Sequence, residues 1–377
     1  MHRRCAFCSA DNLQLIEPAL LSMEPIVLAL ASNERYFPGL YCAVASALSH
    51  LNAARKVDLK VLDGGISRAS RDTLSKLIDR IGEAGRLEFV RVDPSVFGNA
   101  TLGPGQSHMA YCRILLPHLL DVPRLIYLDC DVLVFRDLSE LFDIGLHAGK
   151  ILAAVPDSET LTLSDDSHVL AGALNLPADG RYFNSGVMLM NVNELRKEKF
   201  TEKSLEFFKS WRGRYRFWDQ SAFNFLLHGR IDGLPEDWNR ASWRFDEQDD
   251  NRLDCVLHYT SSAPWLGGRR GPAQVLFERF AVDAGLPVNR QIAALKRSRR
   301  QQLFRNVLAP FRALGFPLVF FFYKIAGQKE KCAAYQKAAC YWLYYILNAP
   351  RRRRLHHRRA EQIQSMKFTF AAFKSAA

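Results

Sequence analysis

The stretch "RLIYLDCDVLVFRDLSELF", residues Arg124–Phe142, places two carboxylates inside an otherwise apolar run. Leu125–Leu128 is short, continuous and apolar, which is typical of a buried strand, and it leads directly to Asp129 and Asp131. In an extended chain these two side chains would share one face. Burying two charges is costly unless something pairs with them. A divalent cation is the natural partner for adjacent carboxylate oxygens, although solvated acids at a strand end would give the same pattern.

Upstream of this stretch, short apolar runs alternate with segments of helical spacing. The predicted strands are Ile26–Ala31, Val57–Leu62 and Leu87–Val92, and the predicted helices are Tyr41–Leu51 and Ser70–Gly82. This alternation predicts an α/β fold with a mostly parallel sheet. Ligands bind beyond the carboxyl ends of the strands in such sheets, which is where the two aspartates would lie.

Downstream, the same reading predicts further strands in "KILAAVPD", "YFNSGVMLMNV" and Val256–Tyr259. It predicts helices at Phe200–Phe208 and Asp219–Leu227, and a helix after Asp137, which is placed to cap it. The segment "MAYCRILLPHLL" is predicted as a helix that Pro117 bends or begins anew.

Six ordered motifs together resemble glycosyltransferase family eight, the retaining GT-A enzymes that include bacterial lipopolysaccharide galactosyl- and glucosyltransferases and glycogenin. The resemblance spans about Ile26 to Trp265. The motifs are "RLIYLDCDVLVFRDLSELF", "HMAYCRILLP", "RYFNSGVMLMNVNELRK", "FWDQSAFNFLL", "LPEDWN" and "HYTSSAPW". The resemblance implies a GT-A fold, which is a Rossmann-like nucleotide-diphospho-sugar transferase fold.

The resemblance also implies site residues. Asp129, Asp131 and His258 would hold Mn²⁺ or Mg²⁺. The catalytic residues would be Gln220, near the anomeric carbon, with Asp219 on a sugar hydroxyl and Arg113 on the diphosphate or sugar. Asp157 is a further candidate for acceptor contact, with plain turn chemistry as the alternative. The donor-binding residues would be Ala31, Asn33, Tyr36, Arg113, Asp129, Cys130, Asp131, Asn184 and His258. Asn239 is a further motif residue.

Two segments depart from the family pattern. "LALASNERY" has Asn33 where the family usually has Asp, and Arg35 where it has Asn. Asn33 can still bind a base edge because its amide offers both a donor and an acceptor. The closing motif "HYTSSAPW" lacks the lysine that the family uses against the diphosphate, and Arg269 or Arg270 could take its place.

The positive charge of the chain is concentrated at its end. The net charge is +12, and residues 291–377 contain 18 of the 51 Lys and Arg but only two of the 39 acids. The preceding residues therefore carry a slight negative excess. We expect a leader of unclear role at 1–23, a catalytic domain at 24–290 and a basic, aromatic arm at 291–377. No run of about 20 apolar residues is present to span a membrane, so the arm is predicted to bind an anionic membrane surface. Nucleic-acid binding and a packed helical extension are the alternatives.

These features predict a metal-dependent, retaining glycosyltransferase. Its donor would be a nucleotide-diphosphate hexose, UDP-glucose or UDP-galactose, and its acceptor a glycan or lipid-linked sugar such as lipopolysaccharide. It would act in the cytoplasm, peripherally on the inner face of the membrane. The alternatives are a glycogenin-like or protein-directed glucosyltransferase, and a non-catalytic membrane or glycan-binding protein that keeps the fold.

Overall fold

The computed structural model describes residues 24–98, 100–101, 108–247, 252–260, 263–266, 271–286 and 349–368. They fall into two compact units. The first contains the described residues up to Ala241 together with Arg252–His258, and the second contains Ser242–Glu247 with the described residues from Tyr259 to Phe368. The leader 1–23, residues 291–348 of the predicted arm, Arg269 and Arg270 lie outside the described residues.

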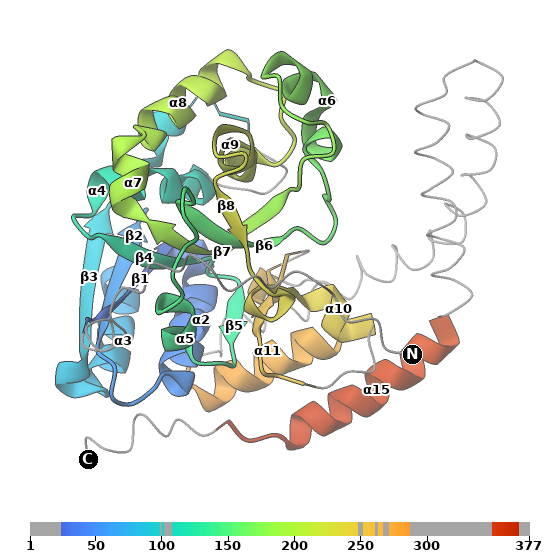
Figure 1. Ribbon diagram of the computed structural model, residues 1–377. Coiled ribbons are helices and arrows are strands. Elements are labelled where there is room, and N and C mark those ends of the chain that lie inside the picture. The colour runs from blue at the N-terminus through green and yellow to red at the C-terminus, as the bar shows by residue number, and fades with distance from the viewer. Residues whose placement is uncertain are drawn as a thin grey trace. The chain divides into compact units, whose positions relative to one another are not determined.

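A seven-stranded sheet forms the centre of the first unit (Figure 1). Its strand order is β3-β2-β1-β4-β7-β6-β8. The strands are β1 (Ile26–Ser32), β2 (Val57–Asp63), β3 (Gly85–Arg91), β4 (Arg124–Leu128), β6 (Leu152–Pro156), β7 (Phe183–Asn191) and β8 (Ile231–Gly233). All neighbouring pairs are parallel except those of β7, which runs antiparallel to β4 and to β6. The predicted mostly parallel α/β sheet is therefore confirmed.

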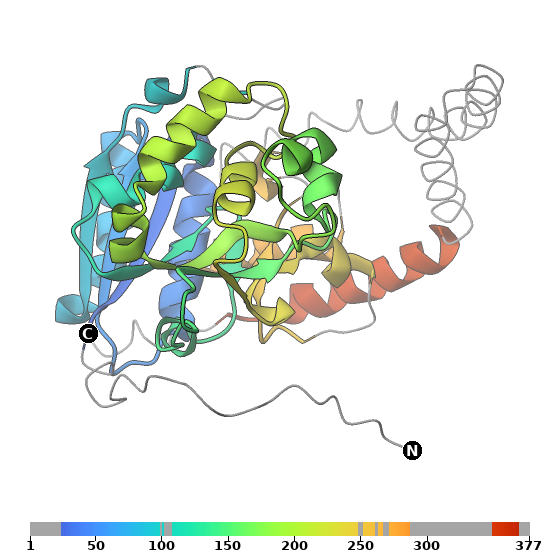
Figure 2. The ribbon, with the colours of Figure 1, turned by 45° about the horizontal axis from the view of Figure 1, so that its top comes forward.

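Helices cover both faces of this sheet. In Figure 1, α2 (Phe37–His50) and α3 (Arg68–Asp79) lie on one side, and α7 (Val192–Lys197), α8 (Phe200–Ser210) and α9 (Trp218–Leu226) lie on the other. Figure 2 shows α8 and α9 over the same face from a second direction. Because both faces are covered, every residue of β1 is buried, which explains why its sequence is a continuous apolar run and does not alternate.

The order of the strands defines where a ligand binds. From β1 the chain proceeds to β2 and β3 on one side, and then to β4 on the other side of β1. This reversal is the topological switch point of an open α/β sheet, where ligands occupy the crevice beyond the carboxyl ends of the strands. The segments that follow β1 and β4 are the 3-10 helix η1 (Glu34–Tyr36) and the aspartate pair.

A second, three-stranded sheet explains the apolar run after the aspartates. It has the order β5-β10-β9, with β5 at Val132–Val134, β9 at Arg240–Ala241 and β10 at Val256–His258. Asp129–Asp131 is a turn between β4 and β5, which belong to different sheets. The chain is therefore not extended through the aspartates, because the strand leaves the first sheet there.

Most other predicted elements of the first unit form, with one change of type. Residues His108–Leu115 form a 3-10 helix, η4, and α4 (Leu116–Leu119) begins anew with Pro117 in its first turn. Asp137 caps α5 (Leu138–Phe142) by accepting the Ser139 amide, as predicted. The remaining elements are α6 (Leu163–Ala173), the 3-10 helices η2 (Gly82–Ala84), η3 (Pro94–Phe97) and η5 (Glu236–Trp238).

The second unit is helical. It contains α10 (Ser242–Glu247), η6 (Pro264–Leu266), α11 (Pro272–Asp283) and α15 (Ala349–Ser365). Helix α15, which falls within the predicted arm, packs against α11, with Ile363 and Arg359 buried. Arg359 also donates to the Phe245 carbonyl at the end of α10. This part of the arm is thus a packed helical extension. None of the helices among the described residues is long and apolar enough to cross a bilayer.

Candidate active site

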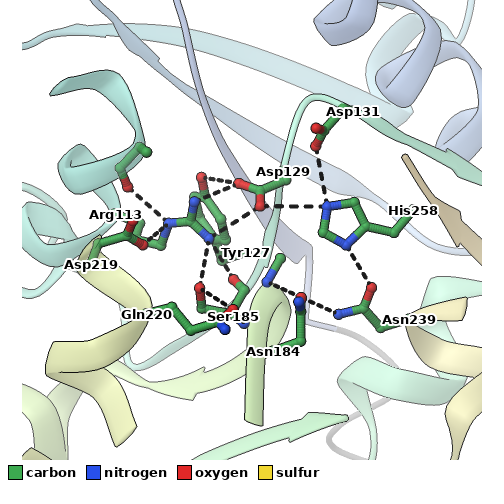
Figure 3. Close-up of polar contacts among 12 residues, drawn as sticks. Arg113, Tyr127, Asp129, Asp131, Asn184, Ser185, Asp219, Gln220, Asn239 and His258 are labelled. Atoms are coloured by element: carbon green, nitrogen blue, oxygen red, sulfur yellow. Dashed lines mark hydrogen bonds and ion pairs between the residues drawn. The ribbon is translucent and has the colours of Figure 1, made fainter. Parts of the chain in front are cut away.

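The side chains of Asp129, Asp131 and His258, which the family resemblance implies as metal ligands, lie close together (Figure 3). One ligand atom from each lies within 4.8 Å of the other two. The His258 Nε2 atom is 3.3 Å from Asp131 Oδ1 and 3.8 Å from Asp129 Oδ2. The reason is strand register, because β10 pairs antiparallel with β5 and places His258 opposite Val132, the residue after Asp131. Two hard oxygen ligands and one imidazole nitrogen suit Mn²⁺ or Mg²⁺.

The ring of His258 is buried and its orientation is fixed. Its Nδ1 atom lies 2.8 Å from the Asn239 Oδ1 atom, and Asn239 immediately precedes β9, the parallel neighbour of β10. Burial opposes the charged ring, but the Asp131 and Asp129 carboxylates outweigh it and raise the pKa of His258 above its ordinary value. The site therefore favours positive charge beside the two carboxylates.

A glycine makes this approach possible. A β-carbon on Gly186, in β7, would overlap the ring of His258 and press on the Asn184 side-chain oxygen. The Gly186 carbonyl also accepts the Asp129 amide at 2.7 Å. Gly186 thus holds the aspartate turn and leaves room for the imidazole.

Arg113 is a buried cation at the centre of the site, with 4% of its surface exposed. Its guanidinium pairs with Asp129 at 2.8 Å and with Asp219 at 2.9 Å, and donates to the Ser185 carbonyl at 2.6 Å. It also lies over the ring of Tyr127, 4.6 Å from the centroid. Through these contacts Arg113 holds the Asp129 carboxylate in position. That Arg113 also contacts the diphosphate or the sugar of the donor stays a prediction.

Asp219 and Gln220 begin α9, and both reach the site. Asp219 is buried, and this burial raises its pKa to about 7 although Arg113 acts in the opposite direction. The residue before it, Trp218, has a left-handed backbone with φ of 55°. Such strain in a non-glycine residue is uncommon and gathers at functional sites. Trp218 is the first residue of α9, so this unusual backbone lies where the helix begins.

The Gln220 side chain is held from both ends. Its Oε1 atom accepts the Ser185 amide at 3.0 Å, and its Nε2 atom donates to Asp157 Oδ2 at 3.3 Å. Asp157 follows β6, and the same Oδ2 atom accepts the Asn184 amide group at 3.0 Å. The carboxylate of Asp157 therefore connects Gln220 with Asn184.

The end of β1 adds a second polar group at the switch point. The Asn33 Oδ1 atom accepts the Tyr36 amide at 3.2 Å and caps η1. Burial raises the pKa of the half-buried Tyr36, as do the neighbouring Cys130 and Asp131, so η1 lies close to the aspartate turn. The side chain of Ala31 packs in the core, and Cys130 is buried in the turn, where burial raises its pKa well above the ordinary value.

Sequence reasoning missed the residues that support the site. Ser185 contacts both Arg113 and Gln220, and the Tyr127 hydroxyl donates to Asp129 at 3.0 Å. Asn224 accepts from and donates to the Phe183 backbone, fixing the start of β7. A polar amide on the apolar side of α9 and a tyrosine inside an apolar strand were the available signals.

An aspartate pair and a histidine that lie close together at the switch point of an open α/β sheet form a candidate metal site, in the place where such sheets bind ligands. Residues 27–267 match the model of Glycosyl transferase family 8. The chain belongs to this family and is a glycosyltransferase with the GT-A fold.

Relatives and solved structures agree with this assignment. General stress protein A of Bacillus subtilis is 30% identical over 214 residues, covering 55% of this chain and 70% of that protein. Lipopolysaccharide 1,2-glucosyltransferase of Escherichia coli is 31% identical over 172 residues, covering 42% of this chain and about half, 49%, of that protein. The galactosyltransferase LgtC, solved in complex with donor and acceptor sugar analogues, is similar in fold, with a TM-score of 0.58 and 23% identity, and the match covers 68% of this chain and 95% of LgtC.

Proposed function

We propose that this glycosyltransferase moves glucose or galactose, with retention of configuration, from a UDP-sugar to a glycan or lipid-linked acceptor such as lipopolysaccharide. The observation that carries the proposal is the convergence of Asp129, Asp131 and His258 at the switch point of the sheet. The family membership and the similarity to a lipopolysaccharide glucosyltransferase support the substrate class.

The three side chains fit a divalent cation. Their ligand atoms are mutually close, and the positive charge of Arg113 already balances part of the charge of Asp129. The carboxylates of Asp131 and Asp129 raise the pKa of His258, so a positive charge is stabilised at this point. Bound there, Mn²⁺ or Mg²⁺ would act as a Lewis acid that neutralises the charge on the departing diphosphate.

The remaining residues would contact different parts of the sugar donor. Asn33 and Tyr36, after β1, would contact the nucleoside. Asp219 and Gln220, at the start of α9, would face the sugar. Asn184 would border the same space from β7. This order follows the sheet, since β4 lies between β1 and β7.

The mechanism of transfer with retention depends on which groups lie beside Gln220. Among the described residues of the site, no carboxylate beside Gln220 is without a partner. Retention in hydrolases usually requires a carboxylate nucleophile. Asp219 is ion-paired with Arg113, and Asp157 already accepts from two amide side chains and two backbone amides. We therefore propose a front-face route, in which the leaving phosphate takes the acceptor proton and Gln220 orients the sugar.

A donor-hydrolysis and transfer assay tests the proposal. UDP-glucose and UDP-galactose are each incubated with the full chain, with Mn²⁺ or with a chelator, and released UDP is measured. We expect turnover with one of the two sugars, lost with the chelator and reduced at least 100-fold in Asp131→Asn. Asp137→Asn, which changes the carboxylate that caps α5, provides a carboxylate control away from the proposed metal site. Equal turnover with and without metal would contradict the proposal.

For the end of the chain we propose attachment to an anionic membrane surface. The support is the excess of 18 basic residues over two acids in residues 291–377, since each basic residue near an anionic leaflet contributes about 1 kcal/mol. Sedimentation with phosphatidylglycerol vesicles should show binding that weakens with salt, and neutral vesicles should show none. Stronger retention by RNA than by these vesicles would instead favour nucleic-acid binding.

A further inference from the structure

We propose that Asp157 is a positioning residue that fixes the ring tautomer of His258 through a chain of side-chain hydrogen bonds. The inference rests on the proposed function, because it treats His258 as a ligand of the metal. It assigns to Asp157 a task at the metal centre that differs from contact with the acceptor.

Three side-chain hydrogen bonds connect Asp157 with His258. The Asn184 Nδ2 atom donates to Asp157 Oδ2 at 3.0 Å. The Asn239 Nδ2 atom donates to Asn184 Oδ1 at 2.8 Å. The Asn239 Oδ1 atom lies 2.8 Å from His258 Nδ1. Figure 3 shows Asn184, Asn239 and His258 in this sequence beside the aspartate pair.

The chain has one possible direction. An ionised carboxylate only accepts, so Asn184 must turn its NH₂ group toward Asp157. Its oxygen then faces Asn239 and also accepts the Gly186 amide at 2.9 Å. Asn239 must therefore donate to Asn184 and present its own oxygen to the imidazole. That oxygen can only accept, so the His258 Nδ1 atom carries the hydrogen.

The consequence for the metal is direct. With the hydrogen on Nδ1, the lone pair of the neutral ring is on Nε2, the atom that lies near Asp131 and Asp129. The opposite tautomer would direct an N–H group at the cation. Partners behind metal ligands typically change metal affinity about 10- to 100-fold when they are removed.

Asp157 is suited to be the fixed end of this chain. Its Oδ1 atom accepts the backbone amides of Glu159 at 2.8 Å and Thr160 at 2.9 Å. Its Oδ2 atom accepts from both Asn184 and Gln220. An amide at this position would have to direct its NH₂ group at other donors, whichever way it turned. The same substitution would therefore also release Gln220.

An exchange of the carboxylate and the amide tests the chain. Asp157→Asn leaves the NH₂ group of Asn184 facing a donor. Only the Gly186 amide then still holds Asn184 in its orientation, so Asn184 and Asn239 turn over more easily. In the double variant Asp157→Asn with Asn184→Asp, the new amide at 157 donates to the new carboxylate at 184. The other oxygen of that carboxylate still accepts from Gly186 and Asn239, so the direction toward His258 is restored. The contact of Asp157 with Gln220 is not restored.

Mn²⁺ affinity is measured by water-proton relaxation on the full chain, with folding checked by circular dichroism. We expect wild-type protein to bind Mn²⁺, Asp157→Asn to bind about 10-fold more weakly or worse, and the exchanged double variant to return to within about 3-fold of wild type. Asn184→Asp alone should bind more weakly than the double variant, because two carboxylates then face each other. Transfer activity should stay low in the double variant, since Gln220 is still released.

The outcomes separate the inference from the proposed function. Asp137→Asn, which removes a carboxylate that caps α5, is the control and should bind Mn²⁺ as wild type does. If the losses at 157 and 184 simply add, or if Asp157→Asn binds normally, the chain of hydrogen bonds does not set the tautomer. If wild-type protein fails to bind Mn²⁺, the proposed metal-dependent function itself is wrong. Should Asp157→Asn not fold, recovery of fold and affinity in the double variant still supports the chain.

Discussion

At the scale of single residues, His258 determines how metal binding depends on pH. Its pKa lies above the ordinary value because Asp131 and Asp129 outweigh the effect of burial. A metal needs the neutral ring, so protons compete with the cation below this raised pKa. We expect Mn²⁺ affinity to fall as the pH falls through it, by about tenfold per pH unit below the pKa, starting at higher pH than for an exposed histidine.

Mn²⁺ titrations between pH 6 and 9 test this dependence. The His258→Gln variant is the control, because it keeps a polar side chain but has no titrating ring. It should bind Mn²⁺ more weakly at all pH values, with a shallower pH slope. An unchanged slope in this variant would show that another group titrates.

Asn33 determines what the base encounters after β1. Its Oδ1 atom is used in capping η1, so the NH₂ group is what remains to contact a base, as a donor. In Asn33→Asp, one oxygen can still cap the helix, and the other would accept from the N3–H group of uracil. We expect the Kd for UDP to fall about 5-fold relative to that for CDP, which corresponds to a hydrogen bond of about 1 kcal/mol.

Competitive displacement of a fluorescent nucleotide measures this change, with both nucleotides tested against both proteins. The outcome that contradicts it is an equal shift for UDP and CDP, which would mean that Asn33 acts only as a cap.

Residue types at the site were largely predictable, but their partners were not. Two charges within an apolar run require compensation, and this requirement marked Asp129 and Asp131 as candidates, with solvated acids at a strand end as the alternative. The motif resemblance supplied His258 and Gln220. By contrast, the ion pair of Arg113 with both Asp129 and Asp219 depends on how η4, β4 and α9 pack. No local pattern encodes that arrangement.

At the scale of elements, β7 and β10 must approach closely for the site to form. Gly186 in β7 leaves the space that the His258 ring occupies. In Gly186→Ala, the ring must turn away or β10 must shift, so we expect Mn²⁺ affinity to fall at least 10-fold. Gly145→Ala is a matched control, since a β-carbon there meets nothing nearby. Comparable Mn²⁺ affinity in the two variants would contradict this account.

The positions of the strands could be predicted from the sequence more accurately than the connection between β4 and β5. Continuous apolar runs identified β1 and β4 to within one residue, because strands covered on both faces exclude polar residues. β2 was predicted to the same accuracy although it contains Asp58 and Lys60. The segment after β4 has the same composition but crosses to another sheet as β5. Hydrophobicity predicts that a segment is buried, but it does not predict which strand the segment pairs with. The turn at Asp129–Asp131 could therefore not be predicted from the sequence.

At the scale of the molecule, ligand binding should stabilise the folded chain, because the unfolded chain cannot assemble residues so distant in sequence. Mn²⁺ and UDP together, at about 100 times their Kd, should add about 2.7 kcal/mol and raise the Tm by roughly 3–5 °C. Differential scanning fluorimetry measures this shift. Asp131→Asn should show less than half of it, and equal stabilisation of the two proteins would place the nucleotide elsewhere.

The division of the whole chain was only partly accessible from sequence. The charge shift near residue 290 marked a change in character, yet α15, within the basic segment, packs against α11 of the same unit. The charge of a segment indicates which partners it can attract. The packing of α15 against α11 depends instead on a few apolar positions such as Ile363. Those few positions are hard to recognise among so many arginines.

The placement of His258 on β10, one of the last strands of the first unit to be made, affects how the protein matures. A ribosome releases the chain from its N-terminus, and domains generally fold in that direction. Asp129 and Asp131 leave the ribosome long before His258. A nascent chain that has formed β1 to β4 therefore still lacks the third proposed metal ligand. On the proposed function, the metal site would therefore be complete only once β10 pairs with β5.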